Sequence, residues 1–305
     1  MIKKYILTIL ATAFCLISMA QDDLKLKLDS IATSGLEKGI PGIQVIISDS
    51  KGYTIYNYGH HEIEKTTEVN DSTRWRYGSI TKVFTAVMIL QLESEGKLSI
   101  DDSATKYIDL KQHNAAGITI KHLLNHSSGL YNYTASKKLK WEDTPNQCLE
   151  NSLKRKLNFT PGSKYDYCNT GYVILGLIIE KITAQSYQQN ITERIFKPCG
   201  LESMIYCSDD KIPFNTARGY KIKYNKYTDF TEIDHSWANS AGAVLGNLTD
   251  LNKFVDCLFK GNLIDSSQLK KMISPTIIYR DLNADGMEWF YHGVGLCWDL
   301  NLDKT

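Results

Sequence analysis

Several signals that identify common protein classes are absent from this 305-residue sequence. The 35 lysines and arginines nearly balance the 34 aspartates and glutamates, so no excess of charge indicates a nucleic-acid partner. No Cys-x-x-Cys pair occurs, which argues against a redox dithiol or a cysteine zinc site. There are no internal repeats and no low-complexity linker. What remains is a chain of ordinary globular composition, 43% hydrophobic, long enough for one large domain or two interleaved subdomains.

The apolar run at the start, Tyr5 to Met19, is about fifteen residues and therefore shorter than the roughly 20 that span a bilayer. Lys3 and Lys4 precede it, and the small residues of Ser18-Met19-Ala20 follow. This arrangement is typical of a cleavable secretory signal. A membrane anchor, or a lipid attached to Cys15, is the less favoured interpretation.

We therefore expect a signal peptide over residues 1–20, a mature domain over residues 21–305, and a secreted or periplasmic protein. Removing two lysines with the signal changes the formal net charge from +1 to −1. Export permits disulfides, although a chain of this size does not need them to fold. Cys199 and Cys207 are the nearest cysteines in sequence and form a candidate bridge.

The hydrophobic pattern predicts a mixed fold. Residues 42–60 give two β-rich runs around Ser50-Lys51-Gly52, which is typical of a hairpin. Apolar residues at helical spacing predict helices within residues 79–96, 118–130, 169–187 and 248–262. Strands followed by a helix-rich middle indicate an α/β or α+β fold with a helical insertion.

Ser79 and Lys82 are the first candidate catalytic pair. Three residues apart on a helix, their side chains share one face, and a neutral lysine could activate the serine. The Ser-x-x-Lys pattern occurs six times in the chain, so spacing alone is weak. Context distinguishes Ser79, because Gly78 precedes it and a strongly apolar helix follows. The alternative is that Ser79 only caps this helix.

A second motif, Tyr167-x-Asn169, occurs once among 18 tyrosines. A phenol near a lysine ammonium can ionise more readily and pass protons between nucleophile and leaving group. The asparagine amide can orient the lysine and hold a substrate carbonyl. The alternative is a turn before a helix, with Asn169 as its cap.

These stretches resemble the serine β-lactamase-related family, which includes class C β-lactamases, D-alanyl-D-alanine carboxypeptidases and esterases. Seven stretches match in family order: RYGSITKVFTA, LESEGKLSIDDSATKYI, ITIKHLLNHSSGL, FTPGSKYDYCNTGYVILGLII, IFKPCGLESM, NSAGAVLGNLTDLNKFV and YHGVGLCWDL. The resemblance implies a β-lactamase/transpeptidase-like fold, an antiparallel sheet flanked by helices with a helix-rich subdomain. It implies that Ser79 is acylated, that Lys82 is its base, and that Tyr167 transfers protons. Asn169 would contact both the lysine and the substrate, and the Ser79 N–H would be one oxyanion donor.

The sequence departs from the family at the third motif, Lys-Thr-Gly or His-x-Gly, since neither Lys-x-Gly nor His-x-Gly occurs in the chain. By resemblance, the second oxyanion donor and the last strands of the main sheet would belong to the part that the sequence lacks. We therefore expect a C-terminally incomplete hydrolase domain.

No metal or organic cofactor is expected. His122 and His126 have the spacing of helical metal ligands, but His126 falls in the LLNHSSGL loop and is better explained by a structural hydrogen bond. The run from Asp281 begins like a calcium loop, but its twelfth position is His292 in place of glutamate, so a turn is the better interpretation.

The first hypothesis is an exported monomeric serine hydrolase that cleaves an amide, β-lactam or ester through an acyl-enzyme. Its substrate would be a small molecule or peptide, and neither nucleic acid nor a stable membrane span is involved. The second hypothesis is a catalytically impaired remnant that binds cell-wall peptides without turnover.

Overall fold

The computed structural model describes residues 23–110, 115–136, 144–207, 212–224, 226–232, 236–282, 289–297 and 299–301. The chain divides into two compact units, residues 1–73 and residues 74–305. The expected signal peptide lies outside the described residues, and the division into residues 1–20 and 21–305 stays a prediction. In the described ranges, no helix has both the length and the apolar character needed to cross a bilayer.

The first unit consists of a helix over residues 23–37 and a β-hairpin. Strand β1 (Gly42–Asp49) pairs antiparallel with β2 (Gly52–Gly59), from Gly42 opposite Gly59 to Asp49 opposite Gly52. Gly52 has a φ of +138°, a conformation that residues with a Cβ rarely adopt. The predicted hairpin is confirmed.

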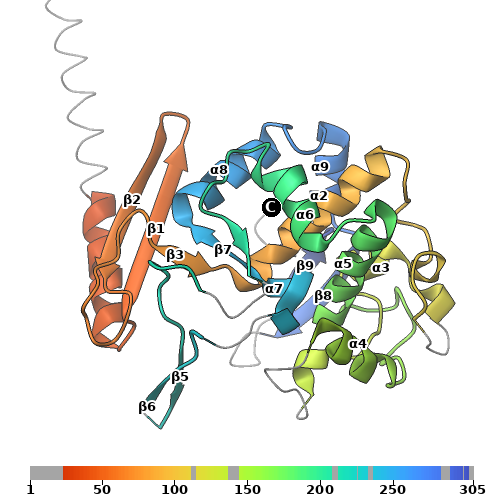
Figure 1. Ribbon diagram of the computed structural model, residues 1–305, viewed down its shortest axis with the longest axis horizontal. Helices are drawn as coiled ribbons and strands as arrows, with labels where there is room; N and C mark the ends of the chain where they lie inside the picture. The colour runs from red at the N-terminus through yellow and green to blue at the C-terminus, as the bar shows by residue number, and fades with distance from the viewer. Residues whose placement is uncertain are drawn as a thin grey trace, which may run out of the picture. The chain divides into compact units, whose positions relative to one another are not determined.

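The second unit combines small antiparallel sheets with helices (Figure 1). The sheets are β3 (Arg74–Arg76), β7 (Val244–Asn247) and β4 (Ile205–Tyr206) in that order, β5 (Tyr220–Lys223) with β6 (Lys226–Asp229), and β8 (Ile277–Leu282), β9 (Trp289–Val294) and β10 (Asp299–Asn301) with β9 in the centre. The α-helices are α2 (Thr81–Ser94), α3 (Ile120–Leu124), α4 (Pro145–Leu153), α5 (Asn169–Thr183), α6 (Tyr187–Ile191), α7 (Asn239–Gly242), α8 (Leu248–Phe259) and α9 (Ser266–Ile273). Short helical turns are η1 (Gly78–Ile80), η2 (Ala104–Lys106), η3 (Ala115–Gly117), η4 (Tyr133–Ala135), η5 (Thr192–Phe196) and η6 (Ser236–Ala238).

Helices α2 and α5 form the centre of the core, and the short helix α7 contacts both. Helix α2 is buried on every side over its middle turns, as its nearly continuous apolar sequence predicts for an interior helix. Phe84 on this helix stacks against Phe254 of α8 with ring centroids 4.0 Å apart. Close approach of α5 to α7 requires Gly176, because a Cβ there would lie 2.2 Å from Ser240 Oγ. This packing fixes α2, whose first turn carries the candidate lysine and which directly follows the turn that carries the candidate serine.

The helix predictions agree with the structure. Helices α2, α3, α5 and α8 fall within the four predicted ranges. Gly96 and Gly261, which follow α2 and α8, have φ values of +70° and +80°, as expected for residues that end helices.

The predicted bridge between Cys199 and Cys207 is wrong, because Cys199 is bonded to Cys257. Cys257 lies on α8, 58 residues away in sequence. Cys207 follows β4, where its N–H donates to Ala243 O as part of the pairing with β7. Cys207 thus belongs to the pairing of β4 with β7.

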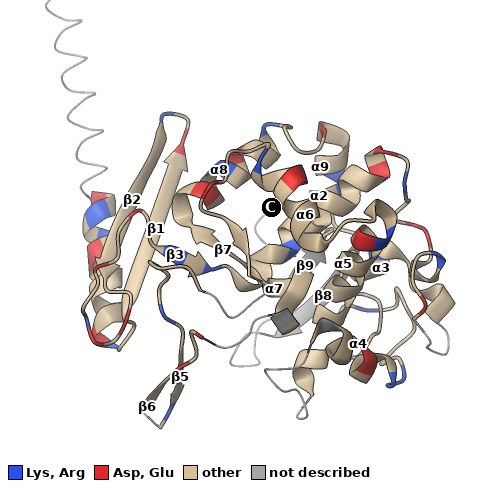
Figure 2. Ribbon diagram, viewed as in Figure 1, with Lys and Arg blue, Asp and Glu red and all other residues tan. Residues whose placement is uncertain are grey.

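Charged residues of both signs are interspersed along the helices and loops, as Figure 2 shows. Several form pairs one helical turn apart, such as Lys260 with Asp256 and Lys197 with Glu193. Exposed pairs of this kind contribute little to stability. The packed helices and the disulfide are the stronger constraints.

We predict that Cys257→Ala lowers the free energy of unfolding by about 2–4 kcal/mol, because the bridge closes a long loop in the unfolded chain. Urea unfolding with and without reductant measures this. Reductant should destabilise the wild type to the level of Cys257→Ala and leave the variant unchanged. A wild type that is insensitive to reductant would contradict the bridge.

Candidate active site

Ser79 lies in a strand-to-helix turn. Strand β3 ends at Arg76, Tyr77 donates its N–H to Val244 O, and η1 then leads directly into α2. Gly78 has a φ of +51°, a left-handed conformation that glycine adopts without strain. This sharp turn leaves Ser79 exposed while the next residues enter the core. The serine is therefore a solvent-accessible hydroxyl on a rigid support.

Lys82 is on the buried face of the same helix, with its residue only 2% exposed. Its Nζ lies 3.1 Å from Ser79 Oγ and donates to Ala241 O at 2.6 Å. Burial disfavours the ammonium and lowers the pKa of Lys82 from 10.5 to about 8, against a smaller raising effect of Cys297 and Cys168. The amine is therefore in hydrogen-bond contact with the hydroxyl and is partly neutral near neutral pH.

Tyr167 supplies the third group. Its hydroxyl donates to Ser79 Oγ at 2.7 Å, and its ring centroid is 5.1 Å from Lys82 Nζ. Burial raises the pKa of Tyr167, and the hydrogen bond to Ser79 offsets this only in part. The expectation that the nearby ammonium makes this phenol ionise readily is therefore wrong in direction. The phenol stays protonated and can donate.

The predicted convergence of Ser79, Lys82 and Tyr167 is confirmed by these distances. Their catalytic roles stay predictions. The hydroxyl is a shared centre, 3.1 Å from an amine and 2.7 Å from a phenol, which is the hydrogen-bond reach that general acid–base chemistry requires.

Asn169, at the start of α5, is positioned differently from our expectation. Its Nδ2 donates to Thr134 Oγ1 at 3.1 Å, and its N–H donates to Asn132 Oδ1 at 3.3 Å. Among the described residues, the hydrogen bonds of Lys82 go to Ser79 and Ala241 and not to Asn169. Its predicted contact with the lysine is therefore replaced by a contact with η4, and its role in substrate binding stays a prediction.

One group beside the lysine, the Ala241 carbonyl, was not predicted from the sequence, whereas His126 beside the tyrosine was expected to make a structural hydrogen bond. The Ala241 carbonyl is a backbone atom in α7, so no side-chain pattern marks it. His126 is 5% exposed, and its ring lies 4.4 Å from that of Tyr167. Its Nδ1 accepts the Cys168 N–H at 3.1 Å, which agrees with the structural hydrogen bond expected of it. In the described part of the chain, no three histidine, cysteine or acidic residues come together as metal ligands do.

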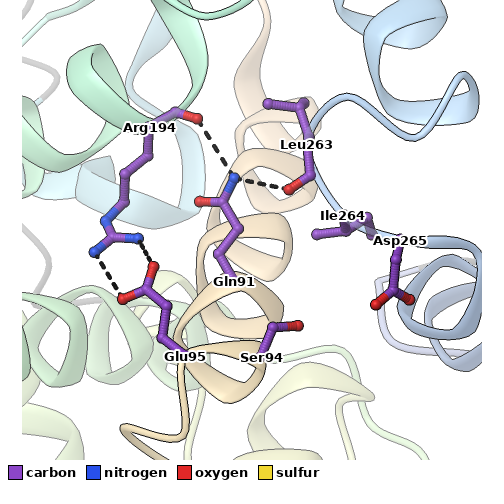
Figure 3. Close-up of a pocket in the computed structure, with 7 residues that line it drawn as sticks. All are labelled: Gln91, Ser94, Glu95, Arg194, Leu263, Ile264 and Asp265. Atoms are coloured by element: carbon purple, nitrogen blue, oxygen red, sulfur yellow. Dashed lines mark hydrogen bonds and ion pairs between the residues drawn. The ribbon is translucent and has the colours of Figure 1, made fainter.

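A second Ser-x-x-Lys pair, Ser94 and Lys97, lies at the opposite end of α2. Ser94 lines a pocket of about 380 Å³ in which Arg194 is ion-paired with Glu95 (Figure 3). The Ser94 hydroxyl accepts a hydrogen bond from Gln268 Nε2. Lys97 forms an ion pair with Glu95, and its side chain is half exposed. This lysine is exposed and paired with a carboxylate, so the same spacing does not bury an amine against the serine there.

Comparisons with known proteins agree with the fold. The family model named Beta-lactamase matches residues 27–303. Protein flp of Staphylococcus aureus (strain MW2) is 28% identical over 286 residues, which cover 88% of this chain and 56% of that protein. The putative penicillin-binding protein PbpX of Bacillus subtilis (strain 168) is 29% identical over 240 residues, covering 78% of this chain and 60% of its own.

Among solved structures, the D-stereospecific amidohydrolase from Streptomyces sp. is similar, with a TM-score of 0.71 and 27% identity over 84% of this chain and 83% of that one. The predicted β-lactamase/transpeptidase-like α/β fold is confirmed. The chain spans little more than half the length of the curated relatives that it matches. Since the family model covers nearly all of the sequence, the chain belongs to the beta-lactamase family of serine hydrolases.

Proposed function

We propose that this protein is an exported serine hydrolase of the class C β-lactamase-like type, which forms an acyl-enzyme on Ser79. The observation that carries the proposal is the position of Ser79 Oγ between Lys82 Nζ at 3.1 Å and the Tyr167 hydroxyl at 2.7 Å. A capping serine would need neither contact. A buried lysine beside an exposed serine is costly, and activation of the hydroxyl accounts for it.

Acylation uses the neutral form of Lys82. That amine retains an N–H for the Ala241 carbonyl, and the 3.1 Å hydrogen bond that Lys82 Nζ donates to Ser79 Oγ would reverse, so that the lone pair of the amine accepts the serine proton. As Ser79 Oγ attacks the substrate carbonyl carbon, its proton moves to Lys82 Nζ. The Ser79 N–H, beside the start of α2, would face the developing oxyanion.

Tyr167 is the group that protonates the leaving group. It is neutral and its hydroxyl points at Ser79 Oγ, so it lies beside the bond that breaks. The phenolate formed would be stabilised by the newly protonated Lys82, which then returns a proton to it. Water next attacks the carbonyl carbon of the acyl-enzyme, and Lys82 and Tyr167 transfer protons in the opposite direction, from the water to Ser79 Oγ, so that the acyl group leaves and the serine is regenerated.

We propose an amide, β-lactam or ester as the substrate, in a small molecule or peptide acted on by a monomer. Amides are the first to test, because one similar solved structure is a D-stereospecific amidohydrolase. Export is supported by the apolar run near the start of the sequence and by the Cys199–Cys257 disulfide, since such bridges persist in oxidising compartments. Asn169 is proposed to contact the substrate from the first turn of α5.

The first test is covalent labelling by a fluorophosphonate, read as the intact mass of the mature protein. We expect a single adduct in the wild type that is lost in Ser79→Ala. Ser94→Ala is the matched control, because Ser94, the last residue of α2, has the same spacing to Lys97, and this variant should label normally.

Two outcomes contradict the proposal. Labelling of Ser79→Ala would identify a different nucleophile. No adduct on folded wild type, with circular dichroism showing native helix content, would favour a remnant without turnover.

The pKa of Lys82 predicts the pH dependence of labelling. Below pH 8 the amine is mostly protonated, so the rate should rise about tenfold per pH unit and level off near pH 8. Lys82→Arg, which keeps its charge at every accessible pH, should label slowly with no such rise. A wild-type rate that is flat or falls between pH 6 and 9 would exclude Lys82 as the base.

The same pKa predicts an effect on stability. The unfolded chain holds the lysine proton up to about pH 10.4, whereas the folded chain releases it near pH 8, so stability should rise with pH in this interval. Relative to Lys82→Met, the wild type should gain about 2 kcal/mol of unfolding free energy between pH 7 and pH 9.5. Urea titrations of both proteins measure this difference, and an unchanged difference would show that the ammonium is not desolvated.

A further inference from the structure

His126 contacts the segment of Tyr167 at three points. Its carbonyl oxygen accepts the N–H of Asp166 at 2.9 Å, and its Nδ1 accepts the N–H of Cys168 at 3.1 Å. These are the residues directly before and after Tyr167. One histidine thus holds the backbone on both sides of the tyrosine.

The ring of His126 makes the third contact. It lies against the ring of Tyr167 with centroids 4.4 Å apart and planes inclined at 33°. The same ring is 5.2 Å from that of Tyr172, a fully buried residue of α5 whose hydroxyl donates to Leu124 O. The imidazole therefore packs against both a fixed core tyrosine and the tyrosine at the site.

The protonation state and backbone of His126 suit this arrangement. Burial and the nearby Lys82 lower the pKa of His126 to about 3, so the ring is neutral. Because Nδ1 accepts from Cys168, the proton is on Nε2. The residue has a φ of +59°, a conformation uncommon for residues other than glycine but adopted more often by histidine, asparagine and aspartate than by most.

We infer that His126 is a positioning residue, which holds the Tyr167 hydroxyl against Ser79 through two backbone hydrogen bonds and a ring contact. The inference rests on the proposed function and deepens it, since it explains how a tyrosine that is 38% exposed keeps one orientation. If His126 only stabilised the loop, its replacement would not shift the position of the Tyr167 hydroxyl while leaving Lys82 in place.

Two variants separate the contacts. His126→Asn keeps an acceptor for the Cys168 N–H and tolerates the positive φ, but removes the ring. His126→Phe keeps a ring and removes the acceptor. The control is His122→Asn, the same change at another histidine, whose ring Nδ1 accepts from the Thr119 N–H at the start of α3.

The readout is fluorophosphonate labelling of Ser79, resolved into the maximal rate and the half-saturating probe concentration. For each His126 variant we expect the maximal rate to fall about tenfold or more, and the half-saturating concentration to stay within about twofold. In a Tyr167→Phe background, His126→Asn should lower the rate by less than about twofold further, because the hydroxyl it positions is gone. His122→Asn should label like the wild type.

Crystal structures of His126→Asn and Tyr167→Phe give a readout that does not depend on activity. We expect the Tyr167 hydroxyl to leave Ser79 in His126→Asn, whereas Lys82 keeps both of its hydrogen bonds. If His126→Phe does not fold, because its backbone is disfavoured at this φ, His126→Asn alone carries the test.

Two results would overturn the inference. One is that His126→Asn lowers the labelling rate in the Tyr167→Phe background by the same factor as in the wild type. The other is that the Tyr167–Ser79 hydrogen bond is intact in His126→Asn. If the wild type is not labelled at all, the proposed function fails by itself. The crystal structure of His126→Asn then still decides whether this histidine positions the tyrosine.

Discussion

The burial of one amine determines the geometry of the site. The Lys82 amine is almost completely buried and has lost most of its contact with water. In place of water it donates hydrogen bonds to the Ala241 carbonyl and the Ser79 hydroxyl. The amine cannot move toward water without breaking its hydrogen bond to Ala241 in α7. It is also protonated less readily than the amine of a surface lysine. Its orientation and its basicity therefore have the same physical origin.

The rest of the second unit keeps the amine in that position. Helix α2 is surrounded by the core, and its polar residues on the α7 side are matched to backbone groups: Thr85 donates to Ser240 O, and Thr81 accepts from Val244 N. Ser240 in turn donates to Tyr172 O on α5. These contacts connect three helices around the lysine, so a small displacement of any one of them changes the distance to Ser79. Dense packing of this kind resists such displacement.

Much of this arrangement could be predicted from the sequence. The core helices follow from nearly continuous apolar residues, and the pairing of Ser79 with Lys82 follows from helical spacing once Gly78 and the apolar run single it out. The position of Tyr167 came from resemblance, because no local pattern relates residues 88 positions apart. The ranges that match the family model agree with that resemblance.

Other features could not be read from the sequence, for physical reasons. The Ala241 carbonyl belongs to the backbone, and any residue type would provide it. The partner of Cys199 depends on which way β4 and α8 face, which is a property of three-dimensional packing. The direction of the Tyr167 pKa shift depends on how far burial outweighs the hydrogen bond to Ser79, and only the folded structure supplies both quantities.

The hydrogen bond from Lys82 to Ala241 also has a consequence for how the protein is made. The two residues are 159 positions apart, so a growing chain contains the serine and lysine long before the carbonyl that receives the amine. Until α7 packs against α2, Lys82 is an ordinary solvated amine with a pKa of about 10.4, and Ser79 is an unactivated alcohol. The buried environment and the two hydrogen bonds of Lys82 are thus acquired only with the long-range contacts of the finished fold.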